Sequence, residues 1–159
     1  MKSRSVTKDE KIAAAQDTST PPEILAQLAR DEDWNVKLSV ALNVSTPPEV
    51  LAQLARDEDW NVRWSVARNT STPPEILAQL ASDKDESVRR SVARNTSTLS
   101  KTFVELARDE DRNVRLNVAW NTSTPPEILL ILMADDDTSV SVITEKNLLN
   151  RVHSVPRTS

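Results

Sequence analysis

The sequence predicts an all-α protein, a solenoid of 26-residue repeats that each contain two short helices, with no β-sheet. The motif Thr-Pro-Pro-Glu, or a degenerate form of it, recurs at a constant spacing, at Thr20, Thr46, Thr72, Thr98 and Thr124. Residues 20–43 and 46–69 differ at only four of 24 positions. No stretch of the chain shows the period-two alternation of apolar and polar residues that a strand requires.

The repeats predict a single domain over residues 9–152. We expect a flexible N-terminus over 1–8, a partial repeat over 9–19, and full repeats that start at 20, 46, 72, 98 and 124. A C-terminal capping helix over about 138–152 and a disordered tail over 153–159 complete the prediction. Helices this short are unstable alone in water, so each must bury its apolar stripe against the next repeat.

The first helix of each repeat is predicted to open with a capping box. Thr72 would accept from the backbone of Glu75, Glu75 would bond back, and Pro73 would occupy the first helical position. The fourth copy lacks both prolines and the glutamate, so Ser100 is expected to cap instead and to shift that helix start by about two residues.

The second helix follows an Asp-rich turn, and Asp59 is a typical N-cap. Val62, Val66 and Ala67 are expected to face inward, and Asn69 to end the helix in the left-handed conformation because glycine is absent. The same asparagines match the N-glycosylation acceptor pattern, which we interpret as helix caps that happen to fit it. They are Asn43, Asn69, Asn95 and Asn121.

The string from Leu54 to Asn69 resembles the leucine-rich repeat variant, and is similar to the second half of HEAT repeats with their Asp…Val-Arg…Ala signature. The match extends over roughly residues 9–146. It implies a right-handed superhelix of paired helices, one of them partly 3₁₀. The founding member of the variant family also carries an iron–sulfur module, which this cysteine-free chain cannot hold. The family has no common catalytic activity, so the resemblance supplies a fold rather than a function.

Two charged positions recur once per repeat and are expected to form a structural ladder, as in HEAT arrays. Each aspartate would cap a second helix, and the cations would bridge neighbouring repeats. The aspartates are Asp33, Asp59, Asp85, Asp111 and Asp137, and the cations are Lys37, Arg63, Arg89 and Arg115. At the last copy the cation is replaced by Ser141, as expected where stacking ends.

Composition argues against an enzyme and against a bound cofactor or metal. The chain has no cysteine, no glycine and one histidine, His153, so thiolate sites, glycine-rich phosphate loops and His-based triads have no candidates. The Asp-rich strings lack the glycine and the final glutamate of a calcium-binding loop. The first ten residues are charged and no apolar run is long enough for a membrane span, which predicts a cytoplasmic protein.

The positions that differ between copies lie mostly on the second helix at i, i+4 and i+8, which is one helical face. Tryptophan and arginine, the residues enriched at binding hot spots, gather there. The predicted contact residues are Trp34, Leu38, Trp60, Trp64, Arg68, Arg90, Arg94, Arg112 and Trp120. In solenoids of this type the second helix usually lines the concave side. The alternative is that these tryptophans pack as ordinary semi-buried core.

The function predicted from this pattern is a non-enzymatic scaffold that binds a protein or peptide. One alternative is nucleic-acid binding through the same Arg and Trp surface, although the net charge of −4 and the acidic loops oppose it. Another is a structural repeat protein without a dedicated partner. No sequence feature identifies the partner.

The last repeat replaces small and polar positions of its first helix with Leu130, Ile131 and Met133. Large exposed apolar patches are rare in monomers, so these side chains need a cover. We expect the helix at about 138–152 to cover them, using Val142, Ile143, Leu148, Leu149 and Val152. A monomer is favoured on this basis, and the alternative is a dimer through the C-terminal end.

Overall fold

The computed structural model describes residues 6–153, and within that range every regular element is an α-helix. The helices alternate between seven and nine residues until the last, which has sixteen. Their bounds are α1 Lys8–Gln16, α2 Pro22–Leu28, α3 Trp34–Leu42, α4 Pro48–Leu54, α5 Trp60–Arg68, α6 Pro74–Leu80, α7 Glu86–Arg94, α8 Ser100–Leu106, α9 Arg112–Trp120, α10 Pro126–Leu132 and α11 Thr138–His153. The all-α repeat fold expected from the sequence is confirmed.

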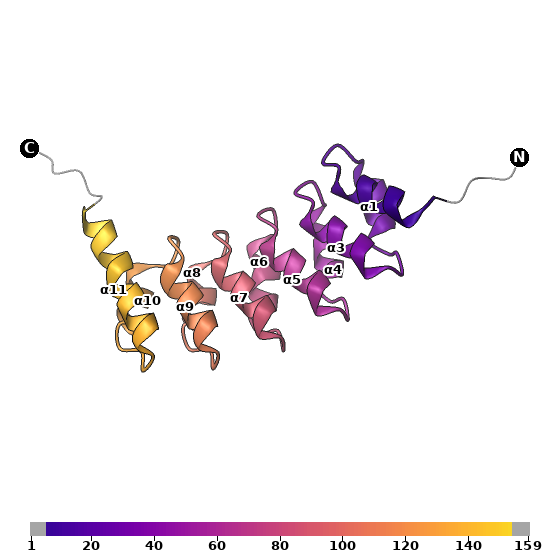
Figure 1. Ribbon diagram of the computed structural model, residues 1–159. Helices are drawn as coiled ribbons and strands as arrows, with labels where there is room; N and C mark the ends of the chain where they lie inside the picture. The colour runs from indigo at the N-terminus through magenta and orange to yellow at the C-terminus, as the bar shows by residue number, and fades with distance from the viewer. Residues whose placement is uncertain (1–5, 154–159) are drawn as a thin grey trace, which may run out of the picture. The chain divides into compact units, whose positions relative to one another are not determined.

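The chain divides into two compact units, residues 1–76 and 77–159, with the boundary inside α6. In the first unit the second helices α1, α3 and α5 stack on one another, and α2 and α4 form the other layer (Figure 1). In the second unit α7, α9 and α11 stack in the same way, with α8 and α10 beside them. Each unit is therefore built from the two-helix repeat that the sequence periodicity predicts.

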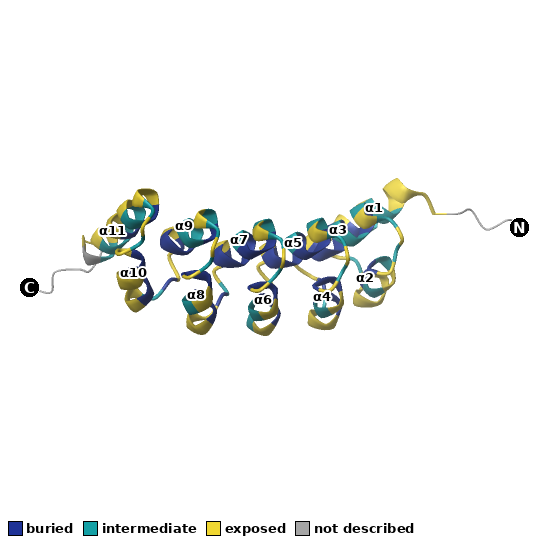
Figure 2. Ribbon diagram, turned by 90° about the horizontal axis from the view of Figure 1, so that it is seen from below, coloured by how far each residue is buried: buried dark blue, intermediate teal, exposed yellow. Residues whose placement is uncertain are grey.

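Buried aliphatic side chains form the core of each unit. Val36, Val62, Val88 and Val114 occupy one second-helix position and are all fully buried. Leu25, Leu51, Leu77 and Leu129 occupy one first-helix position and are equally buried, with Phe103 in their place in α8. Every helix thus has a buried side and an exposed side (Figure 2). The constant repeat length returns the same kind of side chain to the same packed position.

The first helices begin without the capping box that the sequence predicted. α4 begins at Pro48, its N-cap residue is Pro47, and no side chain caps it. The repeat threonine bonds elsewhere: the Thr72 hydroxyl donates to the Val66 carbonyl at 2.6 Å, and Thr46 donates to Val40 at 2.6 Å. The threonine therefore satisfies a carbonyl at the end of the preceding helix, and proline, which has no N–H, reduces the need for a cap.

The degenerate fourth copy also keeps the register of the others. α8 begins at Ser100, which lies one full repeat after Pro74 and one full repeat before Pro126, so the predicted shift of the helix start is wrong. Thr98 holds the helix start in place, because its hydroxyl donates to the Val92 carbonyl at 2.7 Å as the other repeat threonines do. The fixed hydrogen bond, rather than the prolines, sets where the first helix begins.

The asparagine that ends each second helix is extended, not left-handed. Asn69 has φ −67° and ψ 123°, and no described residue has a positive φ. Its side-chain amide donates to the carbonyls of Ala41 and Asn43 in the preceding repeat, at 2.8 and 2.9 Å. These long-range bonds explain why asparagine occupies the position without any need for a left-handed turn.

The same burial bears on the four glycosylation acceptor matches. The exposed fractions of Asn43, Asn69, Asn95 and Asn121 are between 3% and 7%. In Asn43 and Asn121, as in Asn69, the amide nitrogen that a glycan would occupy donates to main-chain carbonyls of the preceding repeat. The interpretation as structural helix ends therefore agrees with the burial and the bonding of these side chains.

The described chain is ordered further toward the N-terminus than the predicted flexible segment 1–8 allowed. Thr7 and Glu10 form a capping box that begins α1 at Lys8. Residues 1–5 lie outside the described part of the chain, as do residues 154–159 of the predicted disordered tail. At the other end, the helix expected over about 138–152 runs from Thr138 to His153. Among the described residues, no helix combines the length and the low charge needed to cross a bilayer.

α11 does not cover the exposed apolar side chains of α10, although the sequence predicted that it would. α11 continues the line of second helices on α9, and Leu130, Ile131 and Met133 are 62%, 46% and 46% exposed. In earlier repeats the position of Met133 is a buried alanine, and Ala107 is only 5% exposed. The difference arises because no further first helix follows α10 among the described residues. The capping prediction is therefore wrong, and the apolar end face lies open.

Exchanging the residues at this repeat position tests whether the side of α10 that carries Met133 is uncovered. Ala107→Met should destabilise the protein by about 1–3 kcal/mol, because the added volume enters a packed site. Met133→Ala should change stability by less than about 0.5 kcal/mol, because the side chain is half exposed. Urea unfolding followed by circular dichroism measures both. A Met133→Ala cost as large as that of Ala107→Met would show that something covers α10.

The dimer alternative for this face stays a prediction. If two copies associate through α10, wild-type protein should sediment as a dimer at micromolar concentration and Ile131→Glu should sediment as a monomer. Gln79→Glu places the same charge at the corresponding exposed position of α6 and should leave the sedimentation coefficient unchanged. A wild-type monomer at all accessible concentrations would contradict the dimer.

Candidate binding surface

Aspartates at the N-cap start every second helix that follows an Asp-rich turn. Asp59 accepts from the Asn61 backbone N–H at 2.8 Å, and Asp111 accepts from Asn113 and Val114 at 2.9 and 3.0 Å. Asp33 and Asp85 make the equivalent bond at 2.9 and 2.8 Å. Since an N-cap acceptor satisfies an otherwise unpaired helix donor, these aspartates fix where each second helix begins.

The cations of the ladder bond to a different aspartate from the one the sequence analysis grouped with them. The partner lies in the next repeat, two residues before its N-cap aspartate. The pairs are Lys37–Asp57, Arg89–Asp109 and Arg115–Asp135, at 2.6, 2.7 and 2.7 Å. The two acids of each Asp-x-Asp string therefore have separate roles, the first binding the cation and the second capping the helix. Both acids recur in every repeat, and that recurrence is the sequence feature from which the role of the first acid could have been predicted.

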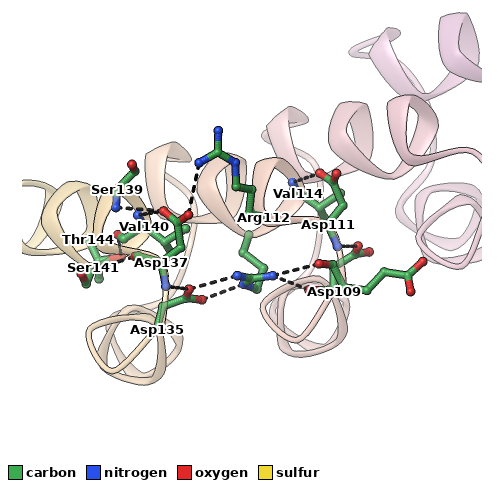
Figure 3. Close-up of polar contacts among 12 residues, drawn as sticks. Asp109, Asp111, Arg112, Val114, Asp135, Asp137, Ser139, Val140, Ser141 and Thr144 are labelled. Atoms are coloured by element: carbon green, nitrogen blue, oxygen red, sulfur yellow. Dashed lines mark hydrogen bonds and ion pairs between the residues drawn. The ribbon is translucent and has the colours of Figure 1, made fainter.

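The pair at the end of the array shows how tightly this ladder is bonded. Arg115 forms a two-point contact with Asp135, its Nε and Nη2 donating at 2.7 and 3.1 Å, and its Nη1 donates to the Asp109 carbonyl at 2.8 Å. Asp135 also accepts the backbone N–H of Asp137 at 2.9 Å (Figure 3). The bond from Arg115 lowers the pKa of Asp135 and raises the pKa of Arg115. In Arg63 the same Nη1 donates to the Asp57 carbonyl at 2.8 Å.

The ladder predicts a pH dependence of stability with a definite sign. The pKa of Asp135 is below its ordinary value of 3.8, so its contribution is complete above that value and is lost as the pH falls through the folded pKa. Asp135→Asn should lower the unfolding free energy by about 1–3 kcal/mol at neutral pH. Urea titrations at about pH 7 and about pH 3 should show the difference from wild type shrinking at the lower pH.

The control for this variant is Asp136→Asn, which neutralises the adjacent, exposed carboxylate. It should change stability little at either pH, because exposed charges far from a partner contribute little. Equal effects of the two substitutions would mean that the bond between Arg115 and Asp135 does not carry the stabilisation.

We use the term second-helix face for the side chains at the three varying positions of the second helices. In the first unit this face is mainly apolar. Trp34, Leu42 and Trp60 are 43%, 39% and 42% exposed, and Leu38 is half-buried. Trp64 is also half-buried, and the Arg68 guanidinium lies 4.5 Å from the centre of its ring. Trp64 and Arg68 are therefore partly used within the fold, whereas Trp34 and Trp60 are open to contact.

In the second unit the second-helix face is cationic around one tryptophan. Trp120 is 59% exposed, more than any other tryptophan of the chain. Arg112 forms an ion pair with Asp137 at 3.2 Å (Figure 3), and Arg90 donates to Ser87 at 2.9 Å. The charged group of Arg94 forms no hydrogen bond or ion pair with the described residues. The structure thus gives the predicted arginines different roles and leaves Arg94 available.

Open pockets lie on both sides of Trp120. A pocket of about 540 Å³ is lined by Arg94, Leu116, Asn117, Trp120 and Asn121. A second, of about 330 Å³, is lined by Trp120 together with Ile143, Lys146, Asn147, Asn150, Arg151 and Thr122. Lys146 varies between repeats but was not among the contacts expected from the sequence. The indole therefore forms a wall shared by two pockets, each with a cation of the second-helix face.

The polar residues of the second pocket are partly used by the fold. Arg151 donates to the carbonyls of Thr124 and Thr122 at 2.7 and 2.8 Å, and Asn147 donates to Ala119 at 2.7 Å. The Asn147 bond repeats, one repeat later, the bond from Asn121 to the Ala93 carbonyl. Among the described residues no three acidic, histidine or cysteine side chains come together as metal ligands. His153 Nδ1 lies 2.7 Å from the Leu149 carbonyl of its own helix.

Comparison with known proteins identifies the repeat. Residues 37–96 match the family model of the leucine-rich repeat variant domain. The repeats within this span are leucine-rich repeat variants. A solved structure, described as a leucine-rich repeat variant with a novel repetitive structural motif, is 30% identical with a TM-score of 0.70. It covers 89% of this chain, while this chain spans only 56% of that one.

A second solved structure, an engineered protein, is 20% identical with a TM-score of 0.50, and the match covers 92% of this chain and 90% of that one. At that identity it supports the fold alone. No curated protein matches the chain. The family and the fold are thus those of a repeat scaffold rather than of an enzyme class. In a leucine-rich repeat variant, function has to be read from the exposed residues that differ between repeats.

Proposed function

We propose that this chain is a non-enzymatic scaffold that binds a protein or peptide through its second-helix face. The supporting observation is the separation of buried and exposed positions within each second helix. Positions that repeat in every copy are buried, such as Val114 and Ala119 at 0% exposure, whereas the varying Trp120 next to them is 59% exposed. A tryptophan that is 59% exposed buries less than half of its surface in the stack, so its presence favours a role in recognition.

The composition of the face favours a protein over a nucleic acid. A phosphate backbone needs a close series of free cations. Here Arg112 is paired with Asp137, Arg68 lies on Trp64, and Arg151 bonds to main-chain carbonyls. The remaining cations are interspersed with apolar side chains, an arrangement that suits a peptide with apolar and acidic residues.

The experiment is affinity capture from a lysate of the source organism, with and without nuclease, quantified by mass spectrometry. The baits are wild type, Trp34→Ala/Trp60→Ala in the first unit and Trp120→Ala in the second. Leu99→Ala is the matched control, because Leu99 is 43% exposed, much as Trp34 and Trp60 are, but lies just before α8, outside the second-helix face. Each bait is first checked for wild-type helicity and melting temperature.

A protein retained by wild type and by Leu99→Ala, but lost from at least one face variant in both lysates, is the expected result. Retention that is the same for every bait would contradict the proposal. Retention that disappears after nuclease treatment would replace it with nucleic-acid binding.

A further inference from the structure

The side chains Arg94, Trp120 and Lys146 occupy the same position in three successive repeats, on the stacked helices α7, α9 and α11. We call them the cation–Trp–cation row. The helices contact in the order α7, α9, α11, so the aromatic ring lies between the two cations. Two pockets connect the row: one has Arg94 and Trp120 in its wall, and the other has Trp120 and Lys146.

The two cations differ from the other basic residues nearby in having no partner of their own. Arg112, Arg115 and Arg151 are each held by a carboxylate or a carbonyl of the fold. The charged groups of Arg94 and Lys146 form no hydrogen bond or ion pair with the described residues. Arg94 sits in the last turn of α7, where a cation also favours the helix dipole, but Lys146 lies in the middle of α11 and has no such role.

We propose that the cation–Trp–cation row is a docking site for an extended acidic peptide, in which two carboxylates flank a large apolar side chain. This inference rests on the proposed function and specifies its partner. Packed helices are about 8–10 Å apart, so two helix steps separate the cations by about 16–20 Å. An extended chain advances about 3.3–3.6 Å per residue, which corresponds to a carboxylate spacing of about five or six residues. The apolar side chain midway between them packs against Trp120.

The residues that line the two pockets suit a peptide with one apolar side chain between two carboxylates. Leu116 on one side and Ile143 on the other give each pocket an apolar base beside the indole. Asn117 and Asn150 add amide groups that suit a peptide main chain. A nucleic acid would instead place a phosphate at every nucleotide, whereas the described side chains of the row offer it two cations, Arg94 and Lys146, on its outer helices.

The test uses fluorescein-labelled synthetic peptides and fluorescence anisotropy with the full chain. The probe peptide has a single Phe with one glutamate three residues to each side, which gives a carboxylate spacing of about six residues. A second peptide replaces the glutamates with glutamines, a third replaces them with lysines, and an oligothymidylate of the same net charge is the nucleic-acid probe. We expect wild type to bind the acidic probe at least about tenfold more tightly than the glutamine peptide or the oligonucleotide.

Substitutions within the cation–Trp–cation row test whether the peptide binds there. Trp120→Ala should weaken the acidic probe by about tenfold or more, and Arg94→Glu or Lys146→Glu by about threefold to tenfold each. Lys101→Glu is the matched control, because it reverses an exposed cation on α8 and should leave binding unchanged. The double variant Arg94→Glu/Lys146→Glu should bind the lysine peptide better than the acidic one, a gain that a folding defect cannot produce.

Equal binding of the acidic and glutamine peptides, tighter binding of the oligonucleotide, or no exchange of preference in the double variant would overturn the proposal. These failures differ from failure of the proposed function. A captured protein that depends on Trp34 and Trp60 but not on the row would leave the scaffold role intact and remove only this site.

Discussion

The repeat depends on an asparagine amide at the end of a second helix, which bonds to two carbonyls at the end of the preceding second helix. Asn43, Asn69 and Asn121 each donate to two carbonyls of the preceding repeat, at 2.8–3.2 Å, while their side-chain oxygens accept a backbone N–H two residues later. Helices of seven and nine residues leave most of their terminal polar groups unpaired. The buried asparagine side chain therefore accepts a backbone N–H in the turn that follows its helix, and its amide nitrogen fixes the distance to the preceding repeat.

This constraint separates the residues that hold the repeats together from those that are free to vary. Asparagine, threonine and the ladder acids carry the polar bonds, and valine, leucine and alanine fill the core. Once these positions are fixed, a second helix retains three varying positions, of which the first and the third are exposed. Tryptophan, leucine and arginine occupy them in different copies, so each unit can present a different surface on the same frame. Trp34 and Trp60 make the second-helix face of the first unit apolar. Arg94 and Lys146 make the second-helix face of the second unit cationic around Trp120.

Sequence periodicity was enough to predict the elements, because every repeat must return equivalent residues to equivalent packed sites. The aspartate caps followed from their place before an apolar helix. Details that depend on three-dimensional bonding were not predictable in the same way. The Thr72 hydroxyl could either cap the helix that follows it or donate to a carbonyl of the helix before it. The sequence does not show that the Val66 carbonyl lies within reach, and the hydroxyl bonds to that carbonyl. Asn69 was expected to be left-handed because glycine is absent, but its amide partners in the preceding repeat favour an extended end.

The sequence was enough to predict where the candidate site lies, but not which residues of that surface are free to bind a partner. Variation between copies identified the helical face, yet it could not show that Arg112 is paired with Asp137 and that Arg94 is free. Lys146 was missed because it is a single lysine in a divergent last repeat. It shares its repeat position with Arg94 and Trp120 in the sequence, and the structure adds the pockets that join the three side chains. The open end at Met133 likewise depends on which neighbour a repeat has, a property of the assembled chain.

The central claim is that repeated positions carry stability and varying positions do not, and the adjacent residues Trp120 and Asn121 test it most directly. Urea unfolding of Asn121→Ala and Trp120→Ala, followed by circular dichroism, compares the two. Asn121→Ala should lose about 2–3 kcal/mol, because it leaves buried carbonyls unpaired, and Trp120→Ala should lose less than about 1 kcal/mol. A loss for Trp120→Ala as large as that for Asn121→Ala would contradict the account, because the tryptophan would then be part of the core.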